Sequence, residues 1–428
     1  MMASIQDRNK KIAENGKATR LRRSSQVCKT FKLKIPSNRI SKKVKDHLHM
    51  IFVESKWIYN YLLSKSEEID IFDIVSNYKS LDKVTHYDKD RNLIETKITH
   101  VLSSVRQELM QQIADQIKGL AKLKAKGHDV GKLRYKSDFK SVKFKQYGVT
   151  HSVRGNKLKL QGCKDLIPLL GLKQLKKYSN LDITTMHLIK EVDDYYVCLT
   201  CYYDDNDTKE YKNDKIGIDL GISSNLTLSD GEKISCYVEE SERTKKLQAV
   251  IARSKKGSNN RHKLRKKLER AYIKDRNRRN DLANKIVHRL VTENRTVVLQ
   301  DDNLNETKDG KSGSVTSDVM QHSILGRVKT KLKTHKNVVW LDKWCPTTQY
   351  CNKCGTKTKL ELSDRTFVCK KCGSTEDRDL HAASNMIIFL EIYASQELAG
   401  VLPNLVRWNQ ISKYLLSEEE STTSSALC

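Results

Sequence analysis

Two pairs of cysteines near the C-terminal end place the tightest constraint on how this chain folds. They have fourteen residues between them and read Cys351-x2-Cys354 and Cys369-x2-Cys372. Four thiolates at this spacing are typical of a zinc ribbon that holds one structural Zn²⁺. A glycine follows each pair (Gly355 and Gly373) and can adopt the left-handed backbone conformation of a tight turn around a metal. The intervening "LELSDRTFV" alternates like a short hairpin.

A second Cys-x-x-Cys pair of a different kind lies in "YYVCLTCYYDD". Cys198 and Cys201 fall in an alternating β pattern, where residues three apart point to opposite faces of a strand. We therefore predict two core thiols there and no metal site. The eleven cysteines of the chain do not form a disulfide framework, which favours a reducing compartment inside the cell.

The net charge predicts a polyanionic partner. The chain has 80 Lys and Arg against 52 Asp and Glu, a formal charge of +28 over 428 residues. Such an excess is typical of a nucleic-acid-binding protein. A membrane surface is the competing partner, but no apolar run approaches the roughly 20 residues that span a bilayer, and the N-terminus lacks the apolar core of a signal peptide. We expect no membrane partner.

The N-terminal half changes character along its length. Residues 1–27 are polar and basic without an apolar period, which predicts a disordered arm. "CKTFKLKIP" alternates as a strand from Cys28, residues 41–130 carry helical apolar periods, and residues 131–210 are rich in short strand patterns. The first strand could join the later ones in a small barrel into which the helices are inserted.

A carboxylate stands inside a predicted strand at the start of the second half. "KIGIDLGISSNLTLSDGEKIS" predicts two adjacent antiparallel strands with a glycine turn, and Asp219 interrupts the apolar run of the first. A charged group buried without a partner costs several kcal/mol, so a metal or a partner should meet it. Asp219 is therefore a candidate site residue.

A strongly basic segment follows. Residues 241–290 hold eighteen Lys and Arg against four acids, with apolar residues at helical spacing. A solvated helical pair would normally mix both signs, so a surface along a phosphate backbone is favoured. The candidate nucleic-acid contacts are Lys255, Lys256, Arg261, Lys263, Arg265, Lys266, Arg276, Arg278 and Arg279, together with Lys143, Lys145, Gln146 and Tyr147 upstream.

Several motifs taken together resemble one family. "IGIDLGISSNLTL", the basic segment, "VVLQDDNL", "PTTQYCNKCG" and "DRDLHAASNMI" occur in the order and spacing of the TnpB transposon-associated proteins and the related compact type V CRISPR effectors. The resemblance is strongest over residues 215–390. It implies RNA-guided cleavage of DNA beside a short flanking motif, with a guide RNA and target double-stranded DNA as partners and a monomer or homodimer on one RNA. It also implies a prokaryotic cytoplasm, with action at the nucleoid.

The fold that the resemblance implies is a multidomain α+β chain. A wedge β-barrel with an inserted helical recognition domain precedes an RNase H-like (RuvC) nuclease domain that contains the zinc ribbon. The expected boundaries are an arm at 1–27, the barrel at 28–40 and 131–210, the recognition domain at 41–130, the nuclease domain at 211–342 and 376–412, the ribbon at 343–375 and a disordered tail at 413–428.

The chemistry of such a nuclease requires several carboxylates that converge on two Mg²⁺ ions about 4 Å apart. Asp219 is one, and the pair Asp301 and Asp302 ends a later strand. Matching "DRDLHAASN" to the family places its last catalytic aspartate at Asp379, at the start of a helix, and leaves Asp377 as a cap or ribbon contact. The expected magnesium ligands are Asp219, Asp302 and Asp379.

"VVLQDDNL" departs from the family, which mostly carries a glutamate where this chain has Gln300. Glutamine is a poor Mg²⁺ ligand beside carboxylates. Residues two apart on a strand share a face, so Asp302 can supply the acid while Asp301 points away, and Gln300 should be dispensable. A decayed site need not keep an acid on the correct face, which favours a relocated acid. The alternatives are a nuclease-inactive RNA-guided DNA-binding repressor and a transposon-associated nuclease that acts without RNA.

Overall fold

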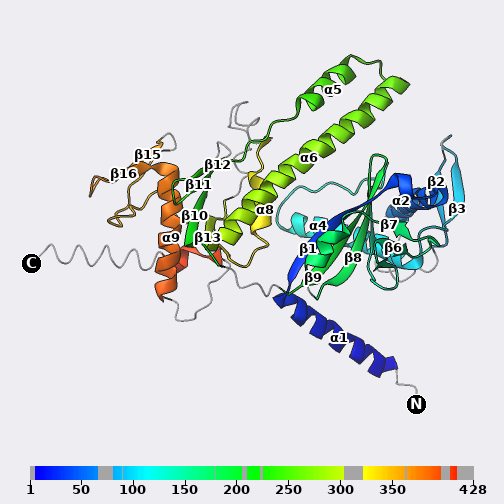
Figure 1. The fold of residues 1–428 in the computed structure, drawn as a ribbon, viewed down its shortest axis with the longest axis horizontal. Coiled ribbons are helices and arrows are strands. Elements are labelled where there is room, and N and C mark those ends of the chain that lie inside the picture. The colour runs from blue at the N-terminus through cyan, green and yellow to red at the C-terminus, as the bar shows by residue number, and fades with distance from the viewer. Residues whose placement is uncertain are drawn as a thin grey trace, which may run out of the picture. The chain divides into compact units, whose positions relative to one another are not determined.

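The computed structural model describes residues 5–65, 81–88, 90–178, 180–204, 210–221, 225–302, 322–361, 364–396 and 405–411. They fall into two compact units, Met1–Asp207 and Thr208–Cys428 (Figure 1). Each unit has its own apolar core. None of the helices in the described part of the chain is both long and apolar enough to cross a membrane.

Two helices and a four-stranded sheet build the core of the N-terminal unit. The sheet has the order β1-β9-β8-β4, formed by Val27–Ile35, Asp194–Tyr203, Asp182–Glu191 and Ser141–Phe144. Helices α2 (Lys42–Lys65) and α4 (Ser103–Ala125) bury one apolar face each. Alternation along β1 buries Phe31, Leu33 and Ile35, as the period of two predicts.

The smaller elements of this unit complete two further sheets. β5 (His151–Arg154), β6 (Lys157–Leu160) and β7 (Ile167–Pro168) form a three-stranded sheet, and β2 (Lys83–Tyr87) pairs with β3 (Leu93–Lys97). Short 3-10 helices cover Ser37–Arg39 and Leu172–Lys177. A bridge between Lys34 and Leu170 links β1 to the segment after β7.

The N-terminal arm is a correction to the sequence analysis. Residues predicted as disordered form helix α1, Ile5–Ser25. Without an apolar period a helix has no apolar face to bury against a core. The segment is nevertheless rich in Lys, Arg and Ala, which have high intrinsic helix propensity, so it can still form a helix. Near its end, Arg22 and Arg23 each bond Asp182 at 2.9 Å, which ties the last turn to β8.

The C-terminal unit is built on a six-stranded mixed sheet of order β12-β11-β10-β13-β14-β17. The strands are β10 (Asn213–Leu220), β11 (Asn225–Leu228), β12 (Lys233–Ser235), β13 (Asn294–Gln300), β14 (Val338–Leu341) and β17 (Leu405–Val406). Strands β10, β13, β14 and β17 are parallel, and β11 and β12 are antiparallel to their neighbours. The predicted glycine turn lies at Gly231, between β11 and β12.

Helices cover both faces of this sheet. On one face, the C-terminal end of α6 (Asn259–Glu293) and α8 (Leu325–Leu332) pack on Ile218, Val297 and Leu299. On the other, α9 (Arg378–Gln396) packs on Val298 and its neighbours. Helix α5 (Glu242–Arg253) lies alongside α6, away from the sheet (Figure 1).

The cysteine ribbon lies between β14 and α9 in the sequence. Its hairpin pairs β15 (Thr366–Val368) with β16 (Thr375–Asp377). In the described part of "LELSDRTFV" the strand is formed by the last three residues, and its partner follows the second cysteine pair. This hairpin turns around the second knuckle, whereas the sequence predicted one within the segment, two residues of which, 362 and 363, lie outside the described part of the chain.

Candidate functional site

The four ribbon cysteines converge on one point. The Sγ atoms of Cys351 and Cys372 are 3.6 Å apart and those of Cys354 and Cys369 are 3.5 Å apart. Among the described residues, they are the one group of three or more His, Cys, Asp or Glu whose ligand atoms all lie within 4.8 Å of one another. Zn–S bonds of about 2.3 Å give a tetrahedron with edges of about 3.8 Å, so this donor set fits zinc.

Both knuckles use the same backbone turn. Gly355 N donates to Cys351 O at 2.9 Å, and Gly373 N donates to Cys369 O at 3.0 Å. The two glycines have φ of +69° and +70°, the left-handed conformation that the sequence predicted. A hydrogen bond with Ser374 lowers the pKa of Cys372 to about 6, which favours the thiolate form that binds a metal.

Two side chains of helix α9, His381 and Asn385, contact the ribbon and the turn that leads into it. The His381 ring is fully buried and stacks on Phe367 at 3.8 Å, and its Nε2 donates to Tyr350 O at 2.7 Å. Asn385 Nδ2 donates to the carbonyls of Thr347 and Tyr350 at 2.6 and 2.7 Å. Sequence reasoning quoted "DLHAASN" as a motif but gave no role to these two side chains. The i, i+4 spacing of His381 and Asn385, on one helix face, was the signal available.

The three predicted acids lie on the sheet face that α9 covers. On β13 the buried side chains alternate, with Val297 and Leu299 toward α6 and α8 and Val298 toward α9. The same alternation places Asp219 on the α9 face of β10, one residue beyond Ile218, which faces α6 and α8. The charges of Asp379 and Asp302 both act on Asp219, which places the three carboxylates near one another.

A glycine sets the distance between α9 and β10. Gly217 lies two residues before Asp219 and therefore on the same face of the strand. A Cβ at Gly217 would lie 1.9 Å from the backbone oxygen of Ala383. Asp379 precedes Ala383 by four residues and shares its helix face, so this backbone contact places Asp379 over Asp219.

We expect Gly217→Ala to misplace the acid site. The nearest obstacle is backbone, which cannot rotate away, so α9 must shift on the sheet. Overpacking of this kind typically lowers the free energy of unfolding by about 1–3 kcal/mol. Thermal unfolding of the variant measures the loss. Gly326→Ala is the matched control, because a Cβ there meets nothing within 4 Å. Equal stability of the two variants would contradict the close approach of α9.

The pKa of Asp219 is raised to about 7. Burial is the largest cause, the charges of Asp379 and Asp302 add to it, and Arg378 opposes it. The three carboxylates therefore repel one another. Carboxylates that repel one another in this way are the donor set that divalent cations neutralise.

We predict that Asp219 destabilises the metal-free protein as pH rises. The folded protein keeps the proton up to about pH 7, whereas an unfolded aspartate loses it near 3.9. Stability therefore falls as pH rises from about 4 to about 7 and is level above that. Asp219→Asn should raise the free energy of unfolding by about 1–3 kcal/mol at pH 8 without added Mg²⁺ or Mn²⁺ and have little effect at pH 4. Thermal melts of both proteins across this range measure the difference. A constant difference at all pH values would show that Asp219 does not titrate in this window.

Two neighbouring acids, Asp301 and Asp377, have structural partners. Asp301 points to the opposite face, as the alternation predicted, where Lys329 and Lys333 of α8 bond it at 2.8 and 3.0 Å. Burial would raise the pKa of Asp301, but these two ammonium groups hold it below its ordinary value. Asp377 Oδ1 accepts the N–H groups of Asp379 and Leu380 at 3.1 Å, the cap that the sequence predicted.

Gln300 is an anchor, which corrects the expectation that it is dispensable. Its side chain is 6% exposed, and Nε2 donates to the carbonyls of Asp342, Lys343 and Cys345 at 3.2, 3.1 and 2.7 Å. Its Oε1 accepts a hydrogen bond from Thr347 Oγ1 at 3.0 Å. The amide therefore ties β13 to the turn that leads from β14 into the ribbon.

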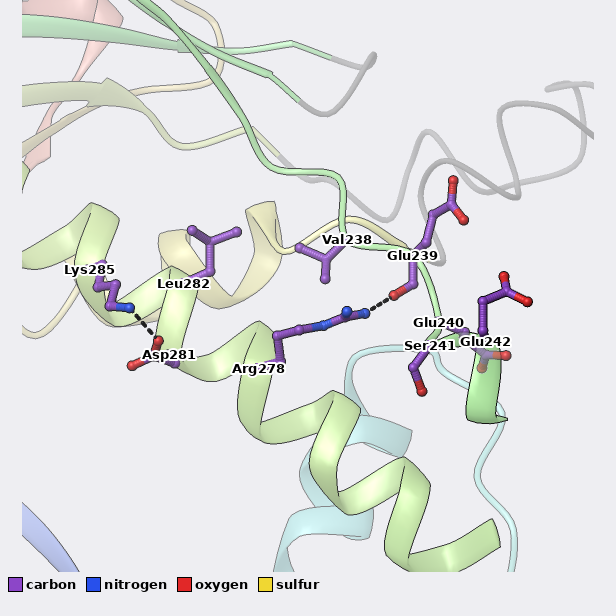
Figure 2. Close-up of a pocket in the computed structure, with 9 residues that line it drawn as sticks. All are labelled: Val238, Glu239, Glu240, Ser241, Glu242, Arg278, Asp281, Leu282 and Lys285. Carbon is purple, nitrogen blue, oxygen red and sulfur yellow. Dashed lines mark hydrogen bonds and ion pairs between the residues drawn. The ribbon is translucent and has the colours of Figure 1, made fainter. Parts of the chain in front are cut away.

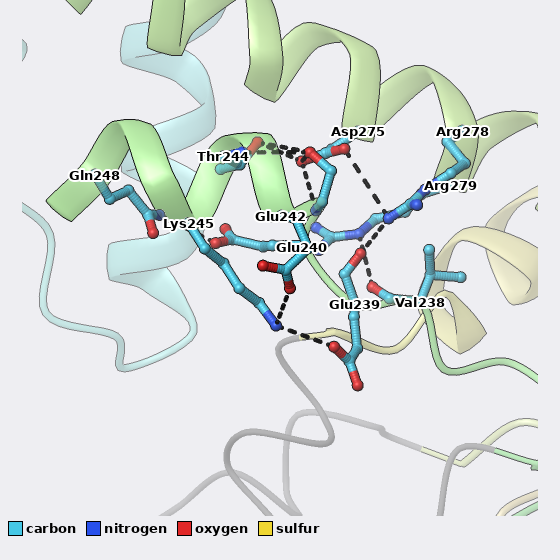
Figure 3. Close-up of polar contacts among 11 residues, drawn as sticks. Val238, Glu239, Glu240, Glu242, Thr244, Lys245, Gln248, Asp275, Arg278 and Arg279 are labelled. Carbon is cyan, nitrogen blue, oxygen red and sulfur yellow. Dashed lines mark hydrogen bonds and ion pairs between the residues drawn. The ribbon is translucent and has the colours of Figure 1, made fainter. Parts of the chain in front are cut away.

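The basic segment forms the α5–α6 helical hairpin. Three of the residues predicted to contact nucleic acid make hydrogen bonds that stabilise this hairpin. Arg261 Nη1 donates to the carbonyls of Ile251 and Ser254, both at 2.6 Å, at the end of α5. Arg278 and Arg279 extend from α6 to the backbone carbonyls of the segment before α5 (Figures 2 and 3). These arginines have an intramolecular role that charge counting does not reveal.

A buried carboxylate completes this arrangement. Asp275 is 5% exposed and accepts hydrogen bonds from Ser241 N, Ser241 Oγ and Thr244 Oγ1 at 3.2, 3.0 and 2.6 Å, beneath the start of α5 (Figure 3). Ser241 in turn caps α5. A pocket of about 600 Å³ beside it is bordered by Glu239 and Arg278 (Figure 2). The α5–α6 hairpin is thus fixed at its base by paired polar groups.

The remaining predicted contacts of the hairpin have exposed side chains. The exposed residues are Lys255, Lys256, Lys263, Arg265, Lys266 and Arg276. In the N-terminal unit, by contrast, Lys143 and Lys145 bond the buried Glu108 of α4 at 3.0 and 2.8 Å. The backbone carbonyl of Gln146 accepts a hydrogen bond from Thr150 Oγ1. Tyr147 is 39% exposed, and its ring contacts the ring of His151. The sequence analysis missed Glu108, which looks like one more polar position in an amphipathic helix.

Two family models match the chain. The model OrfB_IS605, described as "Probable transposase", matches residues 197–309, and the model of the Cas12f1-like TNB domain matches residues 323–386. The two matches cover the region in which the sequence motifs were found. They confirm the resemblance to the TnpB family and the compact type V effectors.

Two curated relatives carry the same description. One, from Streptomyces pristinaespiralis, is named "Putative RNA-guided DNA endonuclease" and is 38% identical over 178 residues, 40% of this chain and 44% of that protein. InsQ of Escherichia coli K12, with the same printed description, is 20% identical over 364 residues, 78% of this chain and 85% of its own. The chain thus matches less than half of the Streptomyces relative.

A solved structure is similar at low identity. It is titled "Cryo-EM structure of the Cas12f1-sgRNA-target DNA complex", and it aligns with a TM-score of 0.48 and 14% identity over 85% of this chain and 99% of that one.

Proposed function

We propose that this protein is an RNA-guided DNA endonuclease that cleaves target DNA beside a short flanking motif. The observation that carries the proposal is the meeting of Asp219, Asp302 and Asp379 on one face of a mixed sheet, since the charges of the other two act on Asp219. The names of the relatives support the substrate class. The segments that the two family models match, residues 197–309 and 323–386, contain all three acids.

The three aspartates would hold two Mg²⁺ ions. The charges of Asp302 and Asp379 act on Asp219, and two ions about 4 Å apart would share and neutralise such a group of carboxylates. When bound, the ions would activate a water and stabilise the leaving oxygen of a phosphodiester. Asp219 and Asp379 are positioned for this by the Gly217 contact, and Asp302 by the end of β13. The four cysteines would hold one structural Zn²⁺.

We keep the domain boundaries predicted from the sequence, with one change: the N-terminal arm contains helix α1 (Ile5–Ser25) and is not disordered there. The sheet of the C-terminal unit would be the RuvC-like nuclease domain, and the ribbon a target nucleic-acid-binding insert. In the N-terminal unit the two larger sheets would be the wedge barrel, with α2 and α4 in the helical recognition domain. Residues 413–428 lie outside the described part of the chain, and a tail there remains a prediction.

The nucleic-acid partners follow from charge and chemistry. In RNA-guided systems base pairing reads the sequence, while the protein holds the heteroduplex by its backbone and shape. The exposed cations of the α5–α6 hairpin suit phosphate contacts, which carry no sequence information. A guide RNA and double-stranded target DNA are the proposed partners, bound by one chain or by two copies on one RNA.

A repressor without nuclease activity is the second candidate, and Gln300 favours it. The position that mostly carries a glutamate in the family holds a glutamine whose side chain anchors a turn. Under that function the acids would be remnants, and target binding would proceed without cleavage. Asp302, which acts on Asp219 from the same face, favours the nuclease.

Purification with its RNA tests the proposed function. The protein should carry a discrete noncoding RNA whose variable end defines a target. Duplex DNA that matches this end should be cut in Mg²⁺ beside a suitable flanking motif, and a mismatched duplex should not. Random cellular RNA fragments would contradict a guide. Discrete RNA with target binding but no cleavage would favour the repressor.

A further inference from the structure

Trp344 is an aromatic ring presented to solvent beside the acid site. It is 68% exposed, whereas Trp340 is 7% exposed and Trp57 and Trp408 pack against apolar cores. Leaving an indole of this size in water forgoes the favourable free energy of burying its apolar surface. Lys343 places its Nζ 4.7 Å from the centre of the ring, so a cation sits against the exposed aromatic.

The turn that carries this ring is rigidly held. Trp344 N donates to Asp342 Oδ1 at 3.3 Å, and Cys345 N donates to Asp342 O at 3.0 Å. Gln300 donates to the carbonyls of the residues on both sides of Trp344. Cys345 is buried and fixes the far end of the turn. The backbone that carries the exposed ring is thus fixed, which lowers the entropy lost when the ring binds a ligand.

The anchor of the turn is adjacent to the acids. Strands β10 and β13 are parallel with Ile218 opposite Leu299, so Asp219 and Gln300 are neighbours in the sheet. At the other end, the charge of Asp302 acts on the thiol of Cys345. Trp344 therefore lies on a turn that is close to the acids at two points. Its anchor Gln300 is next to Asp219 in the sheet, and the charge of Asp302 acts on its last residue, Cys345.

We infer that Trp344 and Lys343 form a stacking platform for an unpaired DNA base next to the scissile phosphate, a proposal that rests on the proposed function. An aromatic ring next to a cation is the usual pairing for single-stranded nucleic acid, with the ring on the base and the cation on the backbone. A base within a duplex has both faces covered by its neighbours. The ligand of the platform is therefore a single strand, held with its backbone toward Asp219.

Binding of oligothymidylate tests the platform without cleavage. The probe is an oligothymidylate that does not match the co-purified RNA, added to the full chain with that RNA and without Mg²⁺ or Mn²⁺. Trp344→Ala should weaken binding by about five- to hundredfold, because stacking on one base has this size. We expect binding to quench the tryptophan fluorescence of the wild type. Trp344→Phe should restore most of the affinity and remove this quenching.

The control is Val368→Ala, a comparably exposed apolar side chain at 49% on the ribbon strand β15, which should bind like the wild type. Wild-type affinity in Trp344→Ala, or full quenching in Trp344→Phe, would overturn the platform. The two proposals fail separately. Matched DNA that is cut normally by Trp344→Ala, with unchanged oligothymidylate binding, removes the platform alone. Trp344-dependent binding in a protein that never cuts removes the nuclease alone.

Discussion

Replacing Asp219 or Asp379 with alanine should lower the rate of guide-matched DNA cleavage by about 10³-fold or more. Each substitution removes a carboxylate that the proposed ions need. The guide RNA and the target should still bind, because the exposed cations of the α5–α6 hairpin are unchanged. Cleavage and filter-binding assays on the same RNA-loaded protein separate the two properties.

Asp377→Asn is the matched control for Asp379→Ala. It removes a charge two residues away and keeps an oxygen that can cap α9. Its cleavage rate should stay within a few-fold of the wild type. Equal loss of cleavage in the control and in Asp379→Ala would mean that the start of α9 matters for structure and not for metal binding.

Replacing Cys354 with serine should release the ribbon metal and unfold the ribbon. Zinc binding at four thiolates contributes on the order of 10–16 kcal/mol to folding in small zinc domains, and the ribbon has only a small apolar cluster around Phe367 to replace it. Metal content should fall from one zinc per chain to nearly none. Limited proteolysis should then cut within residues 343–375. Cleavage activity of the wild type should still require added Mg²⁺ or Mn²⁺, because the structural metal does not supply that chemistry.

Cys198→Ser provides the comparison, since Cys198 belongs to the Cys-x-x-Cys pair whose members lie on opposite faces of β9. That variant should keep its zinc. A full complement of zinc in Cys354→Ser would contradict the assignment of the ribbon, and loss of zinc in Cys198→Ser would place the metal elsewhere.

Local patterns predicted what depends on local geometry. The spacing of the cysteine pairs fixed the clustered thiols and the left-handed turns at Gly355 and Gly373. The period of two along "VVLQDDNL" predicted that Asp301 points to the opposite face from Asp302. On that opposite face Asp301 forms ion pairs with Lys329 and Lys333 of α8. In both cases the deciding contact lies within a few residues or follows from the alternation of one strand.

Contacts between distant segments could not be predicted in this way. The amide of Gln300 meets carbonyl groups more than forty residues later, and Glu108 meets lysines on a strand that the sequence places in another domain. A family glutamate at position 300 would bring carboxylate oxygens to the three carbonyls that now accept from Gln300, which is unfavourable without reorganisation. The chain therefore retains a glutamine for the turn while Asp302 faces Asp219.

The most direct test of the relocated acid compares cleavage of guide-matched DNA by the wild type, Asp302→Ala and Asp301→Ala in Mg²⁺. The account predicts that the wild type cuts, that Asp302→Ala binds the target but does not cut, and that Asp301→Ala keeps most of the activity at some cost in stability. Asp302→Glu should retain part of the activity because the carboxylate survives. A wild type that binds the target and never cuts it, or cleavage that survives in Asp302→Ala and vanishes in Asp301→Ala, would contradict it.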